Sequence, residues 1–128
     1  MFDKSGTTKA SYVSVKQILA NVELQSSVGC VVPQSLGVTV GTQKIAKAGT
    51  PVKINLLSLS TAVVAATAEV AMNAVLLHDV DVKAGAANGT ALIFGFVNEN
   101  RVDSDVLALI KTALTATGVS EKLTFMKV

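Results

Sequence analysis

Tryptophan is absent from this 128-residue chain, and aromatic residues of all kinds make up only 4% of it. A flat aromatic surface that stacks nucleobases is therefore not expected. Charge is also sparse: 16% of the residues are charged and the net charge is +2, which does not indicate a nucleic-acid-binding protein. Half of the residues are apolar, mostly Val, Ala and Leu, so we expect a folded chain with an aliphatic core.

Cysteine occurs once, at Cys30, which excludes an intrachain disulfide and a zinc site built from several cysteines. The first nine residues contain no apolar run, so we expect no signal peptide and synthesis in the cytosol. Residues 1–12 are polar and aperiodic, which predicts a flexible N-terminal arm. The length suits one domain, which we place at residues 13–128.

Basic residues gather in the first half of the chain. Residues 1–60 contain six lysines against two acids, a net charge of +4, whereas residues 61–128 contain five basic residues against seven acids, a net charge of −2. If the first half forms one side of the fold, that side could face an acidic partner. The alternative is an ordinary mixed, solvated surface.

Two apolar runs, Val75–Val82 and Thr90–Val97, organise the chain. Between them, Lys83–Gly89 contains Asn88-Gly89, a strong turn dipeptide, so the pattern predicts a hairpin. The second run is apolar at both alternating positions, with Leu92, Phe94 and Phe96 on one face and Ala91, Ile93 and Val97 on the other. Such a strand is usually covered on both sides, so we expect it at the centre of the core.

Residues 15–57 predict several short elements. Val15–Leu24 fits a short helix or a strand, and Ser26–Pro33 fits a loop or a short strand. Alternation in Leu36–Thr42 predicts a short strand and a turn. Residues 43–57 predict a strand, a turn at Ala48–Pro51, and a second strand with Val52, Ile54 and Leu56 on one face.

The run Leu56–Leu77 is nearly uncharged and about long enough to span a bilayer. We set a membrane span aside because Glu69 and Asn73 lie inside the run and polar groups are costly in lipid. A loop followed by a strand, or an Ala-rich helix over residues 62–73, remains open.

The clearest helix is predicted at about residues 104–117. Asp103 or Ser104 can cap its start, and Asp105 lies at its positive end. An apolar stripe follows the helical period, formed by Val106, Leu107, Ile110, Ala113 and Leu114. Gly118 suits the helix stop, and Lys122–Val128 alternates like a terminal strand.

Candidate chemistry is weak throughout. His78, Asp79 and Asp81 are of the residue types that bind metals, but strand alternation places the histidine and the acids on opposite faces. Cys30 and His78 could form a nucleophile pair, yet no positioning motif surrounds the cysteine. The glycine stretches lack the Gly-Lys-Ser/Thr of a phosphate loop. We therefore expect no catalytic, cofactor-binding or metal site, and no enzyme.

Several segments in order resemble the head decoration and head-fibre proteins of tailed bacteriophages. They are Lys44-Ile-Ala-Lys-Ala-Gly-Thr-Pro-Val52, Ala74-Val-Leu-Leu-His-Asp-Val-Asp-Val82, Asn88-Gly-Thr-Ala-Leu-Ile-Phe-Gly-Phe-Val-Asn-Glu-Asn-Arg-Val102, the amphipathic helix, and the closing Leu123-Thr-Phe-Met126. The resemblance covers about residues 28–128. It implies a mainly β (α+β) fold, a small β-barrel-like domain of short strands with one C-terminal helix.

The function that this resemblance implies is structural. Such proteins bind the outer surface of the phage capsid as trimers and stabilise or decorate the head. The partners would be the major capsid protein and further copies of the chain, with no nucleic acid and no membrane, and the chain would be made in the host cytoplasm. Because the sequence ends directly after its last predicted strand, we expect a decoration or cement role over a full fibre.

Contact residues are predicted on the same basis. Capsid contacts are expected in the arm, at Thr7, Thr8, Lys9 and Tyr12. Trimer contacts are expected at His78, Lys83, Asn88, Asn98 and Arg101. Two other functions remain as alternatives: a non-enzymatic β-rich binding or adhesion module, such as a fibre base or carbohydrate-binding domain, and an enzyme or metal protein that uses Cys30, His78 and the acids.

Overall fold

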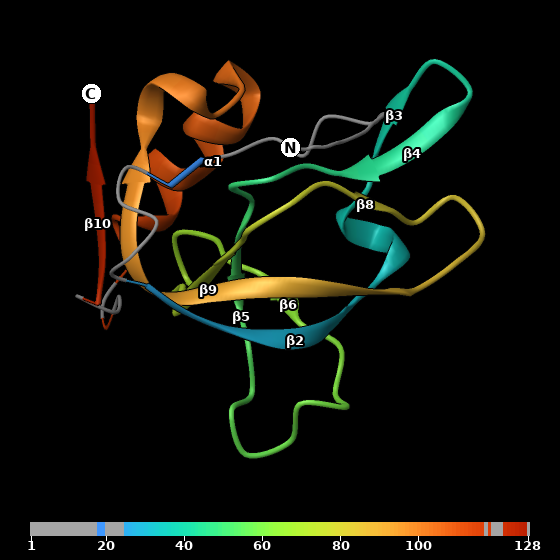
Figure 1. Ribbon diagram of the computed structural model, residues 1–128, viewed down its shortest axis with the longest axis horizontal. Coiled ribbons are helices and arrows are strands. Elements are labelled where there is room, and N and C mark those ends of the chain that lie inside the picture. The colour runs from blue at the N-terminus through green and yellow to red at the C-terminus, as the bar shows by residue number, and fades with distance from the viewer. Residues whose placement is uncertain (1–17, 20–24, 117, 119–121, 128) are drawn as a thin grey trace, which may run out of the picture.

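The computed structural model describes residues 18–19, 25–116, 118 and 122–127, and the part described is mainly β, as predicted (Figure 1). Its strands are β2 (Ser26–Val32), β3 (Val38–Val40), β4 (Gln43–Ala46), β5 (Pro51–Lys53), β6 (Val64–Ala65), β7 (Ala74–Leu76), β8 (Val80–Asp81), β9 (Ala87–Asn98) and β10 (Leu123–Met126). Its helices are the 3-10 turns η2 (Gln34–Leu36) and η3 (Glu99–Arg101) and the α-helix α1 (Ser104–Ala113).

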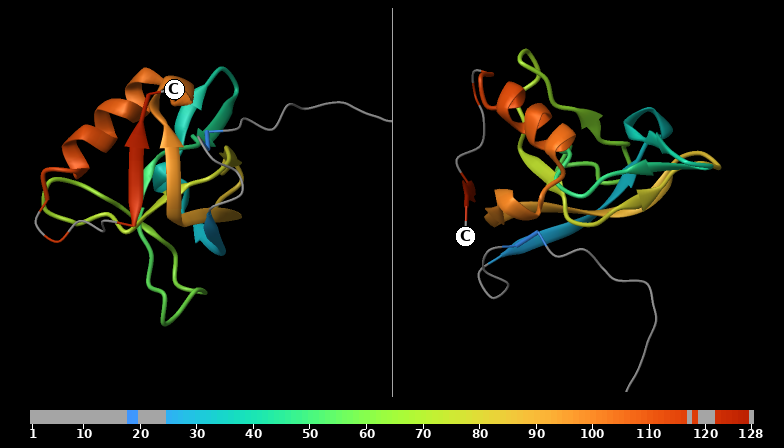
Figure 2. Two further views of the ribbon diagram at one scale, coloured as in Figure 1. Left: turned by 60° about the vertical axis from the view of Figure 1, so that its left-hand side comes forward. Right: turned by 90° about the horizontal axis from the view of Figure 1, so that it is seen from above.

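The strands form one sheet of six and one of three. The larger sheet has the order β10-β9-β7-β5-β6, and β2 also pairs with β9. The smaller sheet has the order β3-β4-β8. The two sheets do not close into a barrel, so the domain is an open arrangement of β-sheets with α1 packed beside them (Figure 2).

Strand β9 is central in the larger sheet, as expected for residues 90–97, but Phe94 is 39% exposed, so the expected cover on both faces is wrong at that position. Leu92 pairs with Ser27 of β2 and with Val75 of β7, so β9 is hydrogen-bonded along both edges. The strand bends within its length (Figure 1), Gly95 has a φ of +154°, and the last residues of the strand pair in parallel with β10. One strand therefore connects the body of the sheet to the region of α1 and β10.

The predicted hairpin of residues 75–97 is wrong in its first half. Strand β7 ends at Leu76 and pairs with β9, but β8 belongs to the smaller sheet, where Val80 pairs with Ala46. Residues 77–79 carry the chain from one sheet to the other. The alternating pattern of residues 75–82 does not show such a change of sheet, because each segment is compatible with a strand in either sheet.

The turn predicted at Asn88-Gly89 is also wrong. Both residues lie inside β9, where they pair with Val31 and Cys30 of β2. A Cβ atom on Gly89 would approach the Cγ2 atoms of Val32 and Val80 to 2.9 Å. The glycine is therefore required by close packing of β9 on its neighbours rather than by a turn.

Residues 36–57 follow the predictions more closely. Strands β3 and β4 form a hairpin through Gly41, whose φ is +62°, and Pro51 begins β5 as expected. The proposed face of the second strand is wrong at one position: Val52 and Ile54 are buried, but β5 ends at Lys53 and Leu56 is half exposed.

The apolar run of residues 56–77 is not helical. It contains a loop, the short strand β6, a second loop and β7, so the loop-and-strand alternative is confirmed and the Ala-rich helix is wrong. Among the described residues, no helix has the length and apolarity needed to cross a membrane.

Helix α1 begins at Ser104 as predicted but ends at Ala113, earlier than residue 117. Asp103 is the N-cap residue, although its side chain makes no capping hydrogen bond. Of the predicted stripe, Val106, Ile110 and Ala113 are buried and Leu107 packs against the core, whereas Leu114 is exposed. Gly118 has a φ of +87° but lies beyond the helix end. The predicted terminal strand is present as β10.

Two apolar clusters form the core. The first joins α1 to the bent end of β9 and includes Ile18, Leu92, Val97, Val106 and Ile110. The second lies between β2, β5, β7 and the smaller sheet and includes Cys30, Val32, Ile54, Leu76 and Val82. Both are aliphatic, in keeping with the composition.

Candidate functional site

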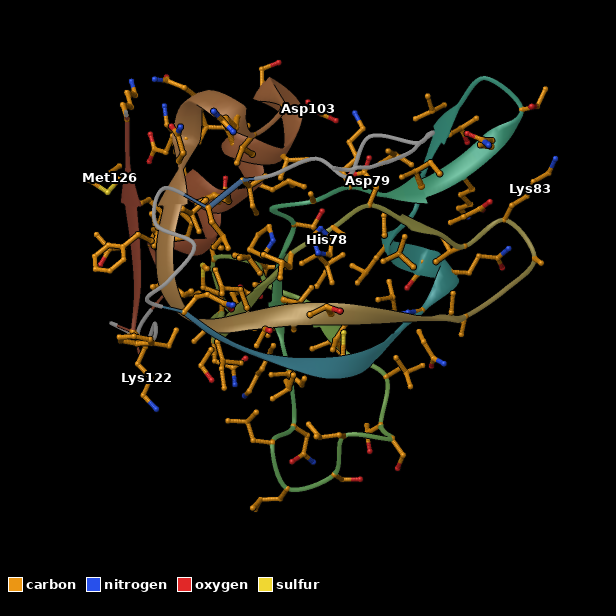
Figure 3. The ribbon with its side chains drawn as sticks, in the orientation of Figure 1. His78, Asp79, Lys83, Asp103, Lys122 and Met126 are labelled. Atoms are coloured by element: carbon orange, nitrogen blue, oxygen red, sulfur yellow. The ribbon has the colours of Figure 1, made fainter. Side chains whose placement is uncertain are left out.

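The histidine and acids of residues 78–81 do not converge on a metal. Asp79 Oδ1 accepts a hydrogen bond from the backbone N–H of Ala48 at 2.7 Å, and Asp81 Oδ1 accepts one from the N–H of Lys83 at 3.0 Å. His78 is half-buried, and its Nδ1 has no hydrogen-bond partner among the residues that the structure describes (Figure 3). Within that part of the chain, no group of three His, Cys, Asp or Glu side chains could hold a metal ion.

Cys30 is buried in β2, within the second core cluster. Burial raises the pKa of its thiol, which lowers the fraction of the reactive thiolate. A small apolar residue in the core is a sufficient account of this position.

The five predicted trimer-contact residues do not form one patch. Lys83 and Asn88 are exposed near the start of β9, whereas Asn98 and Arg101 lie at its other end, beside α1. Asn98 is only 6% exposed, and its Oδ1 accepts the N–H of Asn100, so its side chain organises η3. The predicted capsid contacts Thr7, Thr8, Lys9 and Tyr12 lie outside the described residues.

A feature that the sequence did not single out is the loop between β5 and β6. Its three leucines are exposed, Leu57 at 99%, Leu56 at 49% and Leu59 at 40%. We call these three residues the apolar tip. Figures 1 and 2 show the loop projecting from the body of the molecule, at the end opposite α1.

Local hydrogen bonds fix the shape of the loop that carries the apolar tip. Asn55 Oδ1 accepts the N–H of Leu57 at 3.0 Å, and the Asn55 carbonyl accepts the N–H of Ser58 at 3.1 Å. The Ser58 carbonyl accepts the N–H of Thr61, and the two hydroxyls lie 3.0 Å apart. Two successive turns therefore hold the leucines outward, which lowers the entropy lost when they bind a partner.

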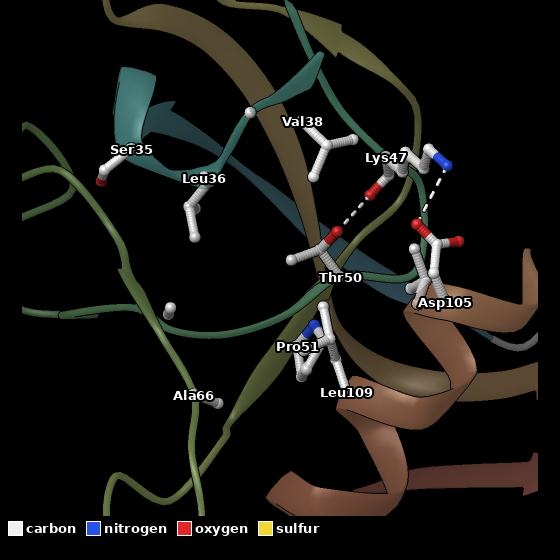
Figure 4. Close-up of a pocket in the computed structure, with 12 residues that line it drawn as sticks. Ser35, Leu36, Val38, Lys47, Thr50, Pro51, Ala66, Asp105 and Leu109 are labelled. Carbon is white, nitrogen blue, oxygen red and sulfur yellow. Dashed lines mark hydrogen bonds and ion pairs between the residues drawn. The ribbon is translucent and has the colours of Figure 1, made fainter. Parts of the chain in front are cut away.

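A second feature is a cavity of about 220 Å³ between η2, the start of β5 and α1, which we call the helix-side pocket (Figure 4). Its lining is mainly apolar and includes Leu36, Val38, Pro51, Ala66, Val106 and Leu109. Val38 and Leu109 are also exposed to solvent, so the pocket opens at the surface.

An ion pair forms the polar rim of the helix-side pocket. Lys47 Nζ lies 3.0 Å from Asp105 Oδ2 and 3.4 Å from Asp103 Oδ2. The hydrogen bond from Lys47 lowers the pKa of the Asp105 carboxyl, and the same contact raises the pKa of Lys47. The two charged residues that line the pocket, Lys47 and Asp105, have opposite charges, so the pocket suits an uncharged apolar group.

No protein-family model, curated protein or solved structure matches this chain. Arguments about function therefore rest on its own residues and geometry.

Proposed function

We propose that this protein is a structural, non-enzymatic subunit that binds the outer surface of a tailed-phage capsid and stabilises or decorates the head. It acts as a homotrimer, and its partner is the major capsid protein.

The observation that carries the proposal is the position of the segments behind the phage resemblance. The Gly-Thr-Pro segment leads into β5, which pairs with β7 through Pro51 and Val75. Strand β7 in turn pairs with β9 through Val75 and Leu92. The three segments behind the resemblance therefore lie side by side in one sheet of this chain, which supports the proposal.

Exposed apolar side chains support a role in assembly. Besides the apolar tip, large apolar residues are exposed on β3, β6, β9, α1 and β10, including Val40, Val64, Phe94, Leu109 and Met126. Scattered exposed residues are ordinary in monomers, but a projecting cluster indicates a contact surface. A small domain also gains stability when it associates, since association buries further apolar area.

The test is a solution mass measurement followed by mixing with empty, undecorated phage heads. We expect a mass of three times the 13.2 kDa of one chain, and sedimentation of the protein with the heads at a saturable ratio. A monomer without affinity for heads would contradict the proposal. Bovine serum albumin mixed with the same heads controls for trapping in the pellet.

A further inference from the structure

We propose that copies of this chain associate by inserting the apolar tip of one protomer into the helix-side pocket of the next. This inference deepens the proposed function, because it rests on the self-association stated there and supplies its contact.

The first argument is the fit of the two surfaces. An apolar cavity of about 150 Å³ accommodates a molecule of benzene, so the 220 Å³ of the helix-side pocket has room for a leucine side chain. The loop that carries the tip, residues 55–62, contains only Asn, Leu, Ser, Thr and Ala. A neutral tip matches a pocket whose rim charges are already paired, Lys47 with Asp105.

The second argument is position. The pocket is lined by α1, η2, the start of β5 and the end of β6, whereas the tip lies in the loop that joins the other ends of β5 and β6 and projects away from α1 (Figures 1 and 2). The tip of one protomer therefore cannot fill its own pocket. Two different surfaces of the same chain can meet reciprocally in a two-fold dimer or head to tail. The proposed trimer requires the head-to-tail contact, which closes as a ring when the rotation permits.

The third argument is that both surfaces are already shaped. The tip is held outward by the hydrogen bonds from Leu57 and Ser58 to Asn55. The pocket lies between elements fixed by the core, because Val106 of α1 is buried in the first cluster and Pro51 is paired in the sheet. Docking therefore requires little rearrangement of either surface.

Two variants and two matched controls test the contact, with mass measured by light scattering during size-exclusion chromatography. L57D places a charge on the tip, and S60D places the same charge on an exposed position of the same loop. L109K places a charge at the pocket, and L114K does so at a similarly exposed position of the helix end that does not line it. We expect L57D and L109K to be monomers and S60D and L114K to keep the wild-type mass.

Mixing the two disrupted variants sharpens the test. L57D retains an intact pocket and L109K an intact tip, so an equimolar mixture should form a dimer with one restored contact. Circular dichroism establishes that each variant is folded before the comparison. The inference is overturned if L57D and L109K keep the wild-type mass, if only one of them dissociates, or if the mixture of two monomeric variants stays monomeric.

Binding to empty phage heads separates this inference from the proposed function. If wild-type protein coats the heads while L57D and L109K keep its mass, the contact is wrong and the capsid role stands. If the variants dissociate as expected but the wild type does not bind the heads, the contact between tip and pocket is right and the capsid role is wrong.

Discussion

At the scale of single residues, Gly89 shows how packing selects a residue. The substitution Gly89→Ala adds a Cβ only 2.9 Å from the Cγ2 atoms of Val32 and Val80. Because both valines are buried, we expect a loss of about 1–3 kcal/mol in the free energy of unfolding, the usual cost of overpacking a core. Urea denaturation of the wild type and the purified variant measures this loss.

The matched control is Gly29→Ala, in the neighbouring strand β2. A Cβ at Gly29 meets no heavy atom within 4 Å, so the variant should unfold at the same urea concentration as wild type or slightly higher. Equal stability of the two variants would show that β9 does not pack on β2 and β8 as described.

Asp79 provides a second prediction at this scale. Ala48 is buried, and its N–H donates to the Asp79 carboxylate at 2.7 Å. Asp79→Ala leaves this N–H without an acceptor, at an expected cost of about 1–3 kcal/mol, whereas Asp79→Asn keeps an acceptor and should cost less. A free energy of unfolding for Asp79→Ala equal to that of wild type would contradict the assignment.

At the scale of elements, the contact between Lys47 and α1 predicts a pH dependence. The Asp105 pKa lies below its ordinary 3.8 and the Lys47 pKa above its ordinary 10.5, in each case chiefly through their hydrogen bond. The contribution of the pair to stability is therefore fully present between those two values. It is lost as the pH falls through the Asp105 pKa, below 3.8, or rises through the Lys47 pKa, above 10.5.

The measurement is the urea midpoint of wild type and Lys47→Met across pH. The pair is near the surface, so we expect a small difference, constant through neutral pH, that shrinks below pH 3.8. If the difference in urea midpoint between wild type and Lys47→Met stays unchanged down to pH 2, the ion pair is not its cause. The effect of Lys47 then comes from the packing of its alkyl chain.

The elements that the sequence predicted well are those whose pattern is local. The alternation in β3 and β10 and the helical stripe of α1 each arise from their own residues. The errors at residues 77–79 and at Asn88-Gly89 both come from partners far along the chain, since β8 pairs with β4 and β9 pairs with β2. A turn propensity of two residues does not outweigh a long strand ladder.

The same distinction applies to the candidate site. The sequence predicted that strand alternation separates His78 from Asp79 and Asp81, but β8 begins at Val80, so residues 78 and 79 precede that strand. It did not show that Leu57 is 99% exposed, because an apolar run has the same composition in a core and at a projecting tip. The pocket could not be predicted from the sequence either, because its lining residues Val38 and Leu109 come from separate elements.

At the scale of the whole molecule, the basic first half of the chain predicts a salt-dependent association. Of its six lysines, three lie at positions 4, 9 and 16, outside the described residues, and Lys47 is paired with Asp103 and Asp105. If the arm meets an acidic capsid surface, binding to heads should weaken as NaCl rises from 0.05 to 0.5 M (~14 to ~4 Å of screening length). Removal of residues 1–12 should weaken binding and reduce that salt dependence.

Circular dichroism of the truncated chain controls for loss of fold. Undiminished binding without the arm would remove Thr7, Thr8, Lys9 and Tyr12 from the contact. If binding of the full chain to heads does not change with NaCl concentration, only the electrostatic contribution of the arm is contradicted.

The pairing of β9 also determines when the protein can fold. Strand β2 cannot pair until residues 87–94 have been synthesised, and β10, which pairs in parallel with residues 95–98, follows them in the chain. Contacts between segments so far apart in sequence are slow to form, and we expect refolding in milliseconds to seconds. A nascent chain therefore exposes β2 and β7 until residues 87–98 have been synthesised, a period in which it is vulnerable to aggregation.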